Sequence, residues 1–343
     1  MTMFMELFSA AYKVAKILAG VKEGESVLIL ADTVVDREMV DYVASAVHSL
    51  GGEAVEMIYE TREEVDIEPP KVVSKAMEAS DVIIDFVKQY IIHTNAFYNA
   101  LKAGARICDL TGMTPDMMIR LIGRVDYELM CELGDKLAEL TKKAREVRIV
   151  SDVGTDVSFE NDPNRPVWHN DGKVRSKGEY KFLGGQVSWA PIEDSINGTL
   201  VVDGFIWPPD EISILSNPVK LTIKEGRIVK IDGGVEASIF DKWLNSFNDE
   251  KMFYVAHVSW GFHPKAKYTG IPLEDERVYG TIEFGFGSQS PRFKGKVGLA
   301  KSHTDVGLRF PKIYFDDELV VENNRFVHSE IADLDKKLVG GSK

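Results

Sequence analysis

Two patterns of hydrophobic and polar positions divide the chain. In its first part, short apolar runs alternate with segments whose apolar positions recur every three or four residues. Such an alternation of strand and helix indicates parallel strands joined by helical crossovers, and hence an α/β domain with helices on both faces of its sheet. The predicted strands are Ser26–Leu30, Ala54–Ile58, Val82–Phe86 and Arg106–Leu110, and the predicted helices lie around Met39–Leu50, Lys71–Ala79 and Thr94–Ala103.

After about Val147 the pattern changes to short β-like runs separated by Gly, Pro, Asn and Asp. This texture is typical of antiparallel sheet. We expect hairpins at Val219–Asp232 and Lys312–Val327, with a short helix at Ser238–Phe247 between them. The prediction is therefore an N-terminal parallel-sheet α/β domain, residues 1–146, which ends in the helix Tyr127–Arg145, and a mostly antiparallel, β-rich α+β domain, residues 147–343.

Composition narrows the range of partners. The 343 residues carry 41 Lys and Arg against 54 Asp and Glu, and no basic run stands out, so we expect no nucleic acid partner. No apolar run reaches the roughly 18 residues that a membrane span needs, and Glu6, Lys13 and Lys16 make the apolar N-terminus an amphipathic helix. Cys108 and Cys131 lie in apolar stretches and indicate buried thiols in a cytoplasmic protein. The fingerprints of nucleotide binding are missing.

A histidine and an aspartate in the second half are the first candidates for chemistry. His303 and Asp305 lie two residues apart in SHTDVGL, and residues two apart on a strand point to the same face. Such a pair forms part of the two-histidine, one-carboxylate arrangement that leaves positions open on Fe(II). His257, inside the apolar run FYVAHVSWGFHP, is the candidate third ligand, and the alternative is a core histidine bonded to a backbone carbonyl.

Five segments in a fixed order carry a resemblance to known proteins. They are TDVSFE, GGQVSWAPIEDSINGTLVVDG, HVSWGFHP, ERVYGTIEFGFG and SHTDVGL. Together they resemble the superfamily that contains the aminopeptidase T metallopeptidases and the 2,5-dihydroxypyridine 5,6-dioxygenases. The resemblance covers nearly the whole chain, makes residues 147–343 the metal-binding catalytic domain, and implies a closed homo-oligomer.

The peptidase branch implies two metal ions that are held by further glutamates, a histidine and a tyrosine beside the H-x-D pair. In this chain Gln186 stands where the first glutamate is expected, His257 replaces the second, and Glu283 replaces the histidine. Neutral Gln186 cannot bridge two cations, so the ligand count falls. The resemblance therefore favours the dioxygenase branch.

The dioxygenase branch holds one Fe(II) through two histidines and an aspartate. The matching positions are His257, His303 and Asp305, and the same resemblance assigns His93, in IIHTNAF, as an acid/base residue. An imidazole suits that task near neutral pH. The resemblance implies a mononuclear Fe(II) ring-cleaving dioxygenase that acts with O₂ on a small hydroxylated aromatic or N-heteroaromatic molecule such as 2,5-dihydroxypyridine.

Several further residues are candidates around the substrate. Lys181 can meet an anionic group, Gln186 lies at a former ligand position, and Trp260 can pack against a flat ring, although aromatic residues in strands are more often simple core. The alternative function is a metal-dependent aminopeptidase or related hydrolase with Zn²⁺ or Mn²⁺, in which Glu283 or Glu276 is the general base. A non-catalytic ligand-binding relative is a third reading.

Overall fold

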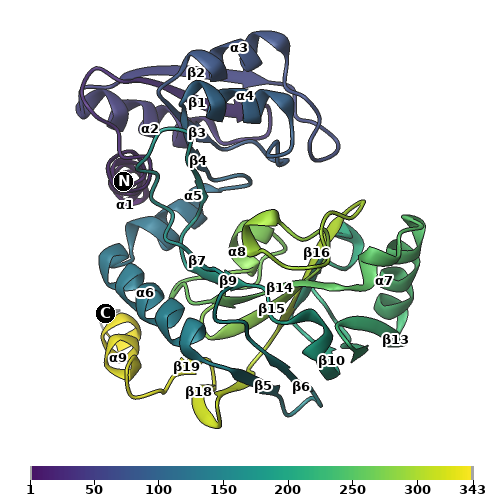
Figure 1. The fold of residues 1–343 in the computed structure, drawn as a ribbon. Helices are drawn as coiled ribbons and strands as arrows, with labels where there is room; N and C mark the ends of the chain where they lie inside the picture. Colours follow the sequence, from purple (N-terminus) through teal and green to yellow (C-terminus); the bar gives the residue numbers. More distant parts are fainter. Residues whose placement is uncertain (1, 341–343) are drawn as a thin grey trace. The chain divides into compact units, whose positions relative to one another are not determined.

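The computed structural model of the protein describes residues 2–340 (Figure 1). Their backbone forms two compact units. The N-terminal unit comprises Met1–Tyr127 and Asn170–Gly184, and the C-terminal unit comprises Glu128–His169 and Gly185–Lys343. This division differs from the expected domain boundary at residue 146, because the chain leaves the first unit at residue 127 and returns to it to add one more strand. Among the described residues, no helix is both long enough and apolar enough to cross a membrane.

The N-terminal unit is built on a five-stranded sheet of order β2-β1-β3-β4-β8. All its neighbouring strands pair in parallel, which confirms the predicted α/β architecture. The strands are β1 (Ser26–Asp32), β2 (Glu53–Tyr59), β3 (Val82–Asp85), β4 (Arg106–Asp109) and β8 (Tyr180–Phe182). The helical segments are α1 (Thr2–Lys13), η1 (Val14–Leu18), α2 (Arg37–Ser49), α3 (Lys71–Ala79), α4 (Asn95–Ala103), α5 (Pro115–Met117) and η2 (Met118–Gly123).

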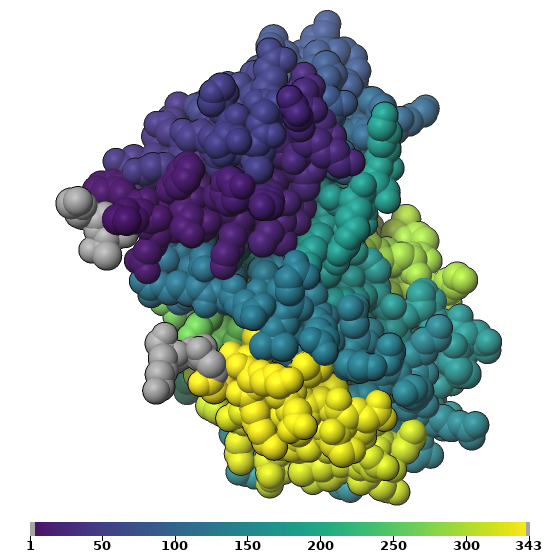
Figure 2. Space-filling view, turned by 90° about the vertical axis from the view of Figure 1, so that its left-hand side faces the viewer, coloured from purple at the N-terminus to yellow at the C-terminus, as the bar shows by residue number. Residues whose placement is uncertain are grey.

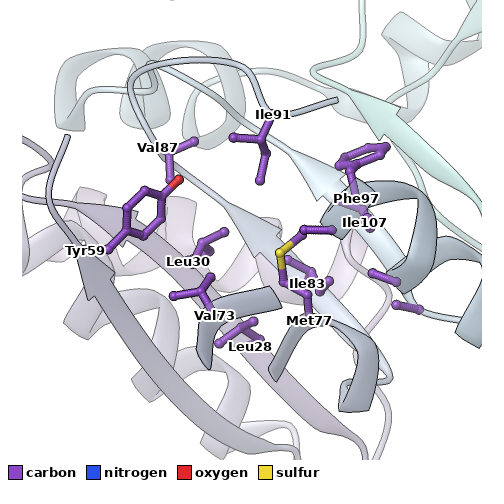
Figure 3. Close-up of a cluster of buried hydrophobic side chains, with 13 residues drawn as sticks. Leu28, Leu30, Tyr59, Val73, Met77, Ile83, Val87, Ile91, Phe97 and Ile107 are labelled. Carbon is purple, nitrogen blue, oxygen red and sulfur yellow. The ribbon is translucent and has the colours of Figure 1, made fainter. Parts of the chain in front are cut away.

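One face of this sheet is covered by α3 and α4. Leu30 and Ile83 from the strands meet Met77 of α3 and Phe97 of α4 in a fully buried cluster (Figure 3). Each such side chain contributes about 1.5–3 kcal/mol through burial. Thr94 sets the start of α4, because its hydroxyl accepts a hydrogen bond from the Phe97 backbone N–H.

The C-terminal unit contains two mainly antiparallel sheets. The eight-stranded sheet has the order β13-β12-β10-β6-β5-β17-β18-β19, and the six-stranded sheet has the order β11-β16-β15-β14-β9-β7. The strands of the first are β5 (Glu146–Val150), β6 (Asp156–Glu160), β10 (Asn197–Val202), β12 (Val219–Lys224), β13 (Arg227–Gly233), β17 (Lys312–Phe315), β18 (Glu318–Glu322) and β19 (Arg325–Phe326). Those of the second are β7 (Val167–Asn170), β9 (Gln186–Trp189), β11 (Phe205–Trp207), β14 (Val255–Gly261), β15 (Thr281–Gly287) and β16 (His303–Leu308).

Two predicted hairpins lie in the eight-stranded sheet. Strands β12 and β13 form the first as expected. The region Lys312–Val327 contains two successive hairpins in place of one. Strands β17 and β18 turn at Asp316–Asp317, β18 and β19 turn at Asn323–Asn324, and all four turn residues have positive φ. The helical segments of this unit are α6 (Tyr127–Lys143), α7 (Val235–Ser246), α8 (Pro272–Asp275), α9 (Ala332–Gly340) and the short turns η3 (Glu193–Ser195), η4 (Asp210–Ile212), η5 (Glu250–Phe253) and η6 (Pro291–Phe293).

Aromatic residues fill the space between the two sheets. Trp260 on β14 packs edge-on against Phe315 of β17, with ring centroids 5.5 Å apart. Phe284 on β15 packs against Phe159 of β6 at 6.3 Å. The six-stranded sheet therefore buries one face in a sandwich core, and its other face is available for polar side chains.

The C-terminal segment is anchored by a buried carboxylate on α9. Asp335 accepts hydrogen bonds from the Tyr279 hydroxyl at 2.9 Å and from the Phe326 backbone N–H at 3.0 Å, and it pairs with the Arg325 guanidinium. The space-filling view shows this yellow segment lying on the surface of the C-terminal unit (Figure 2).

Replacing Asp335 by Ala is expected to lower the free energy of unfolding of the C-terminal unit by about 2–3 kcal/mol, because it leaves a buried hydroxyl and a buried N–H without an acceptor. Urea unfolding followed by tryptophan fluorescence measures the change. The matched control is Asp333→Ala on the same helix, whose carboxylate is 87% exposed and pairs with Lys336 on the surface, so its effect should stay below about 0.5 kcal/mol. Equal losses in the two variants would contradict the anchor.

Candidate metal centre

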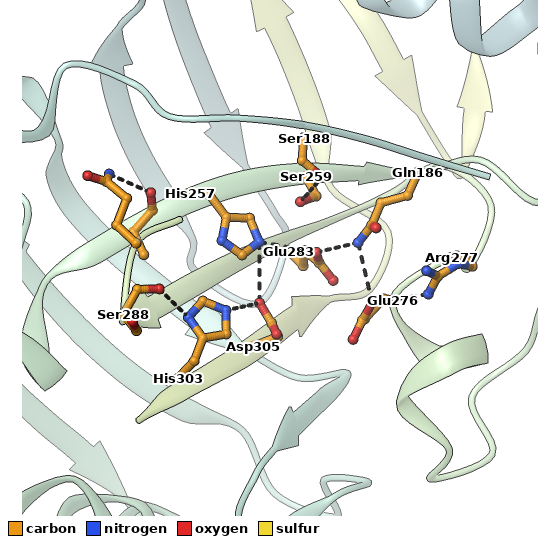
Figure 4. A network of polar contacts seen from close by, with 12 residues as sticks. Gln186, Ser188, His257, Ser259, Glu276, Arg277, Glu283, Ser288, His303 and Asp305 are labelled. Atoms are coloured by element: carbon orange, nitrogen blue, oxygen red, sulfur yellow. Dashed lines mark hydrogen bonds and ion pairs between the residues drawn. The ribbon is translucent and has the colours of Figure 1, made fainter. Parts of the chain in front are cut away.

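The polar face of the six-stranded sheet carries the candidate centre (Figure 4). His257 lies on β14, and His303 and Asp305 lie on β16. Gly285 of the intervening strand β15 pairs with His257 on one side and with Asp305 on the other. Register partners share a face, so the antiparallel pairing itself brings these three side chains together.

The three side chains form a compact donor set. One ligand atom from each of His257, His303 and Asp305 lies within 4.8 Å of the others. The Asp305 Oδ1 atom lies 3.4 Å from His257 Nε2 and 3.2 Å from His303 Nε2. The imidazole rings are nearly parallel, at 9°, with their centroids 5.2 Å apart. Two imidazole nitrogens and a carboxylate oxygen that converge in this way fit a transition-metal ion.

Gly285 makes room for the two rings. A Cβ at this position would overlap the Cε1 atom of His257 and would lie 2.9 Å from that of His303. Any larger residue would push the imidazoles apart. Sequence reasoning missed Gly285, although a glycine between two large apolar residues in TIEFGFG was the available signal.

Neighbouring groups fix the orientation of both rings. The Nδ1 atom of His303 lies 2.9 Å from the Ser288 carbonyl oxygen, which can only accept, so Nδ1 carries a proton and Nε2 is the ring atom left to bind a metal ion. The Phe293 ring lies 5.5 Å from the His257 ring at an angle of 18°. Sequence reasoning also missed Phe293, because nothing in the local pattern shows that η6 returns to β14.

The electrostatic environment favours the ligand forms of His257 and Asp305, whereas in the metal-free protein it favours the protonated form of His303. Burial lowers the pKa of His257 to about 4, so the imidazole is neutral at pH 7. Burial alone would lower the pKa of His303, but the neighbouring Asp305 carboxylate outweighs this effect and the pKa is raised. Burial acts to raise the pKa of Asp305, yet the adjacent His303 lowers it on balance, and the carboxylate stays ionised. A metal ligand needs these deprotonated lone pairs.

Two further carboxyl groups lie beside the triad. Gln186 on β9 donates from Nε2 to Glu283 Oε1 at 2.8 Å and lies 3.4 Å from Glu276 Oε2. The same Glu283 oxygen is 3.6 Å from His257 Nε2, whereas Glu283 Oε2 is buried and has no hydrogen-bond partner among the described residues. Burial, with the charge of Asp305, raises the pKa of Glu283 well above its ordinary value. Burial, with the charge of Glu283, raises the pKa of Glu276 to about 8.

Trp260 and Lys181, two further predicted site residues, are not part of this donor set. Trp260 differs from expectation: it lies three residues from His257, its ring belongs to the sandwich core, and its indole N–H donates to the Thr141 hydroxyl at 2.9 Å. An odd separation along a strand puts the two side chains on opposite faces, so Trp260 is not brought together with the triad. Lys181 lies on β8 of the N-terminal unit, 3.7 Å from Asp171.

His93 also lies in the N-terminal unit, just before α4. Its Nδ1 atom is 2.8 Å from Asp66 Oδ2, its backbone N–H donates to the other Asp66 oxygen, and its side chain is 65% exposed. The roles expected for His93 and Lys181 stay predictions.

The α/β unit, the β-sandwich and the donor set of two histidines and one aspartate together describe a candidate metalloenzyme. The chain belongs to the 2,5-dihydroxypyridine 5,6-dioxygenase family, whose sequence profile matches residues 4–328. It is 29% identical over 267 residues to the 2,5-dihydroxypyridine 5,6-dioxygenase of Pseudomonas putida. This match covers 72% of this chain and 71% of that protein. Family membership makes the chain a dioxygenase.

Solved structures show the same fold. The structure of 2,5-dihydroxypyridine dioxygenase from Pseudomonas putida KT2440 has a TM-score of 0.77 and 24% identity, covering 96% of this chain and 99% of that one. Wild-type AmpT from Thermus thermophilus has a TM-score of 0.64 and 12% identity, covering 94% of this chain and 99% of that one. These findings confirm both the predicted fold class and the predicted resemblance.

Replacing Glu276 by Gln is expected to change how the stability of the metal-free protein depends on pH. An unfolded glutamate titrates near 4.5, and the folded Glu276 titrates at about 8. Between these values the folded state holds the extra proton, so the free energy of unfolding falls as the pH rises toward 8. His257 has a folded pKa of about 4 and an unfolded value of 6.5, and it opposes this trend only below about pH 6.5. The interval from pH 7 to 8 is therefore the informative one.

Over this interval the wild-type stability should fall more steeply than that of Glu276→Gln, by up to about 1 kcal/mol per pH unit. Urea unfolding at several pH values measures both slopes. Glu250→Gln, on the exposed turn η5, is the control and should keep the wild-type slope. Identical slopes in all three proteins would refute the raised pKa of Glu276.

Proposed function

We propose that this dioxygenase binds a single Fe(II) through His257, His303 and Asp305 and opens the ring of a hydroxylated N-heteroaromatic molecule of the 2,5-dihydroxypyridine class with O₂. The observation that carries the proposal is the convergence of these three donors on one sheet face, in a chain of this family. A set of three protein ligands would leave further coordination positions for substrate and O₂. When bound, the iron would supply the electron transfer that lets O₂ react with the ring.

The residues around the triad prepare its ligands and control protons. The Ser288 carbonyl holds the His303 ring in one tautomer, and Gly285 lets both imidazoles approach the same point. Gln186 fixes one oxygen of Glu283. The other oxygen of Glu283 is the atom at which a proton can be held for, or given to, a substrate oxygen, because burial raises the pKa of this carboxyl and so favours its protonated form.

His93 is proposed as a second acid/base group. Asp66 holds its Nδ1 atom, an arrangement that fixes the ring and leaves Nε2 to exchange protons. Lys181 is proposed to contribute positive charge toward an anionic substrate group, although Asp171 already balances part of that charge. The homo-oligomeric assembly and the cytoplasmic location that the sequence suggests stay predictions.

The second candidate is a metal-dependent aminopeptidase that uses Zn²⁺ or Mn²⁺. The two carboxyl groups of Glu276 and Glu283 beside the triad favour it, because hydrolysis needs a general base. A general base must be ionised, however, and the raised pKa values of both groups work against that role near neutral pH.

Oxygen consumption tests the function directly. Protein stripped of metal and reloaded anaerobically with Fe(II) is expected to consume O₂ in proportion to the loss of 2,5-dihydroxypyridine, measured with an oxygen electrode and by absorbance. His303→Ala should lose at least about a thousandfold in rate, because one of three ligands is gone. His48→Ala, on an exposed helix position, is the control and should retain full activity.

No oxygen uptake with dihydroxypyridines or catechols would refute the proposal. Leucyl-anilide cleavage by the Zn²⁺- or Mn²⁺-loaded protein would establish the hydrolase in its place.

Gly285→Ala tests the geometry of the centre. The added methyl group overlaps the His257 ring, so Fe(II) affinity is expected to fall by about tenfold or more while the circular dichroism spectrum stays unchanged. Anaerobic titration calorimetry measures the affinity. Gly340→Ala, where a methyl group meets nothing within 4 Å, is the control. Wild-type affinity in Gly285→Ala would show that the rings do not need this space.

A further inference from the structure

Three aspartates end three neighbouring strands of the N-terminal unit. Asp32 is the last residue of β1, Asp85 of β3 and Asp109 of β4. Asp85 and Asp109 are register partners, and Leu30 pairs with Asp85, which places Asp32 two residues further along β1. Leu30 and Ile83, each two residues before an aspartate, belong to the apolar cluster of Figure 3. We call this row of carboxyl groups the aspartate edge.

The aspartate edge is buried. Asp32 is 2% exposed, and Asp85 and Asp109 are fully buried. In each case one carboxyl oxygen accepts a hydrogen bond from a backbone N–H two residues further on, as Val87 donates to Asp85 Oδ1 at 3.0 Å. Within residues 2–340, no lysine or arginine side chain pairs with Asp32 or Asp85. Adjacent buried carboxylates without a counter-charge are strongly unfavourable, so a cation or a proton must neutralise them.

Two polar atoms at this edge point to a ligand. The Oδ2 atom of Asp85 is buried and makes no hydrogen bond within the described part of the chain. The hydroxyl of Thr111, two residues after Asp109 and 2% exposed, is also buried without a partner there. The loops that carry these groups run side by side, because Leu110 donates to the Asp85 carbonyl oxygen and Gly112 donates to that of Val87.

The position in the fold is that of a ligand site. In the strand order β2-β1-β3-β4-β8, β2 lies on one side of β1 and β3 lies on the other. The chain therefore switches sides of β1, and the switch point lies between β1 and β3. In open α/β sheets, ligands bind outside the carboxyl ends of the strands at this switch point. Asp32 and Asp85 end the two strands that flank it, and the Lys88 backbone N–H donates to Asp32 Oδ2 across the gap at 2.8 Å. A row of carboxyl groups there selects a cation, not a phosphate.

We propose that the aspartate edge binds one hard divalent cation, Mg²⁺ or Ca²⁺, with Asp85 Oδ2 as the open ligand and Asp32 and Asp109 as its neighbours. Carboxylate and hydroxyl oxygens suit these ions, whereas the imidazoles of the C-terminal unit suit iron or zinc. Among the described residues, only His257, His303 and Asp305 bring three imidazole or carboxylate ligand atoms within 4.8 Å of one another, so the carboxylates of the aspartate edge lie further apart. Water therefore completes the shell, as Mg²⁺ ordinarily requires.

The competing explanation is a proton shared between Asp85 and Asp109. Burial and then the charge of Asp109 raise the pKa of Asp85 well above its ordinary value, which favours the protonated carboxyl when no cation is present. The two explanations predict opposite results for Asp85→Asn. Loss of a cation ligand removes the response to Mg²⁺, whereas loss of one member of a proton-sharing pair relieves repulsion and stabilises the protein without any metal.

The experiment uses the full chain with His257→Ala and His303→Ala, so that the histidine centre does not contribute. After chelation and dialysis, Mg²⁺ and Ca²⁺ are titrated separately by calorimetry, and the melting temperature is measured with each ion. We expect saturable binding and a rise in Tm of about 3–6 °C. Asp85→Asn should abolish both effects, and Asp41→Asn, an exposed acid on α2, should keep them.

Flat titrations with both cations in the protein that retains Asp85 would overturn the proposal. A higher metal-free melting temperature of Asp85→Asn, together with those flat titrations, would identify the shared proton. If Asp85→Asn does not fold, Asp32→Asn and Thr111→Val take its place. An affinity at least tenfold lower in Asp32→Asn supports the site, and unchanged affinity in both variants overturns it.

Discussion

The register of β14, β15 and β16 is the constraint on which the C-terminal unit depends. Side chains alternate between the two faces of these strands, so the pairing that buries Trp260 and Phe284 against the other sheet also places His257 and Asp305 on the opposite face. A slip of one residue would exchange the two sets. The aromatic core therefore holds the donor geometry in place, because any movement of the ligands along a strand would carry large apolar rings out of the core.

Burial has a second effect at this face, which is to set protonation states. The same loss of water that keeps His257 neutral also raises the pKa values of Glu276 and Glu283. Asp305 remains ionised because His303 lies within 3.2 Å of it. The surroundings thus favour the ionised form of Asp305 and the protonated forms of Glu276 and Glu283. This division separates a ligand from candidate proton donors, although all three are acidic residues of one site.

The sequence predicted the features that local pattern controls. Apolar runs located β1 to β4 to within two residues, and the two-residue spacing placed His303 and Asp305 on one face. Features that depend on distant contacts escaped it. Nothing near Tyr180–Phe182 shows that this segment joins β4 in the first unit. The position of Trp260, in contrast, could have been predicted. It lies three residues from His257 on the same strand, and an odd separation puts two side chains on opposite faces. The prediction that Trp260 packs against a flat substrate rested on its residue type and did not take this strand geometry into account.

The two units place their carboxylates by different means. In a parallel sheet every strand ends at the same edge, so residues such as Asp32 and Asp85 gather there without any choice of register. In an antiparallel sheet successive strands end at opposite edges, and side chains can converge only on a face. Asp305 and His257 do so across the width of β15, which is why that strand needs a glycine between them. Topology thus decides whether polar groups collect at a rim or at the centre of a sheet.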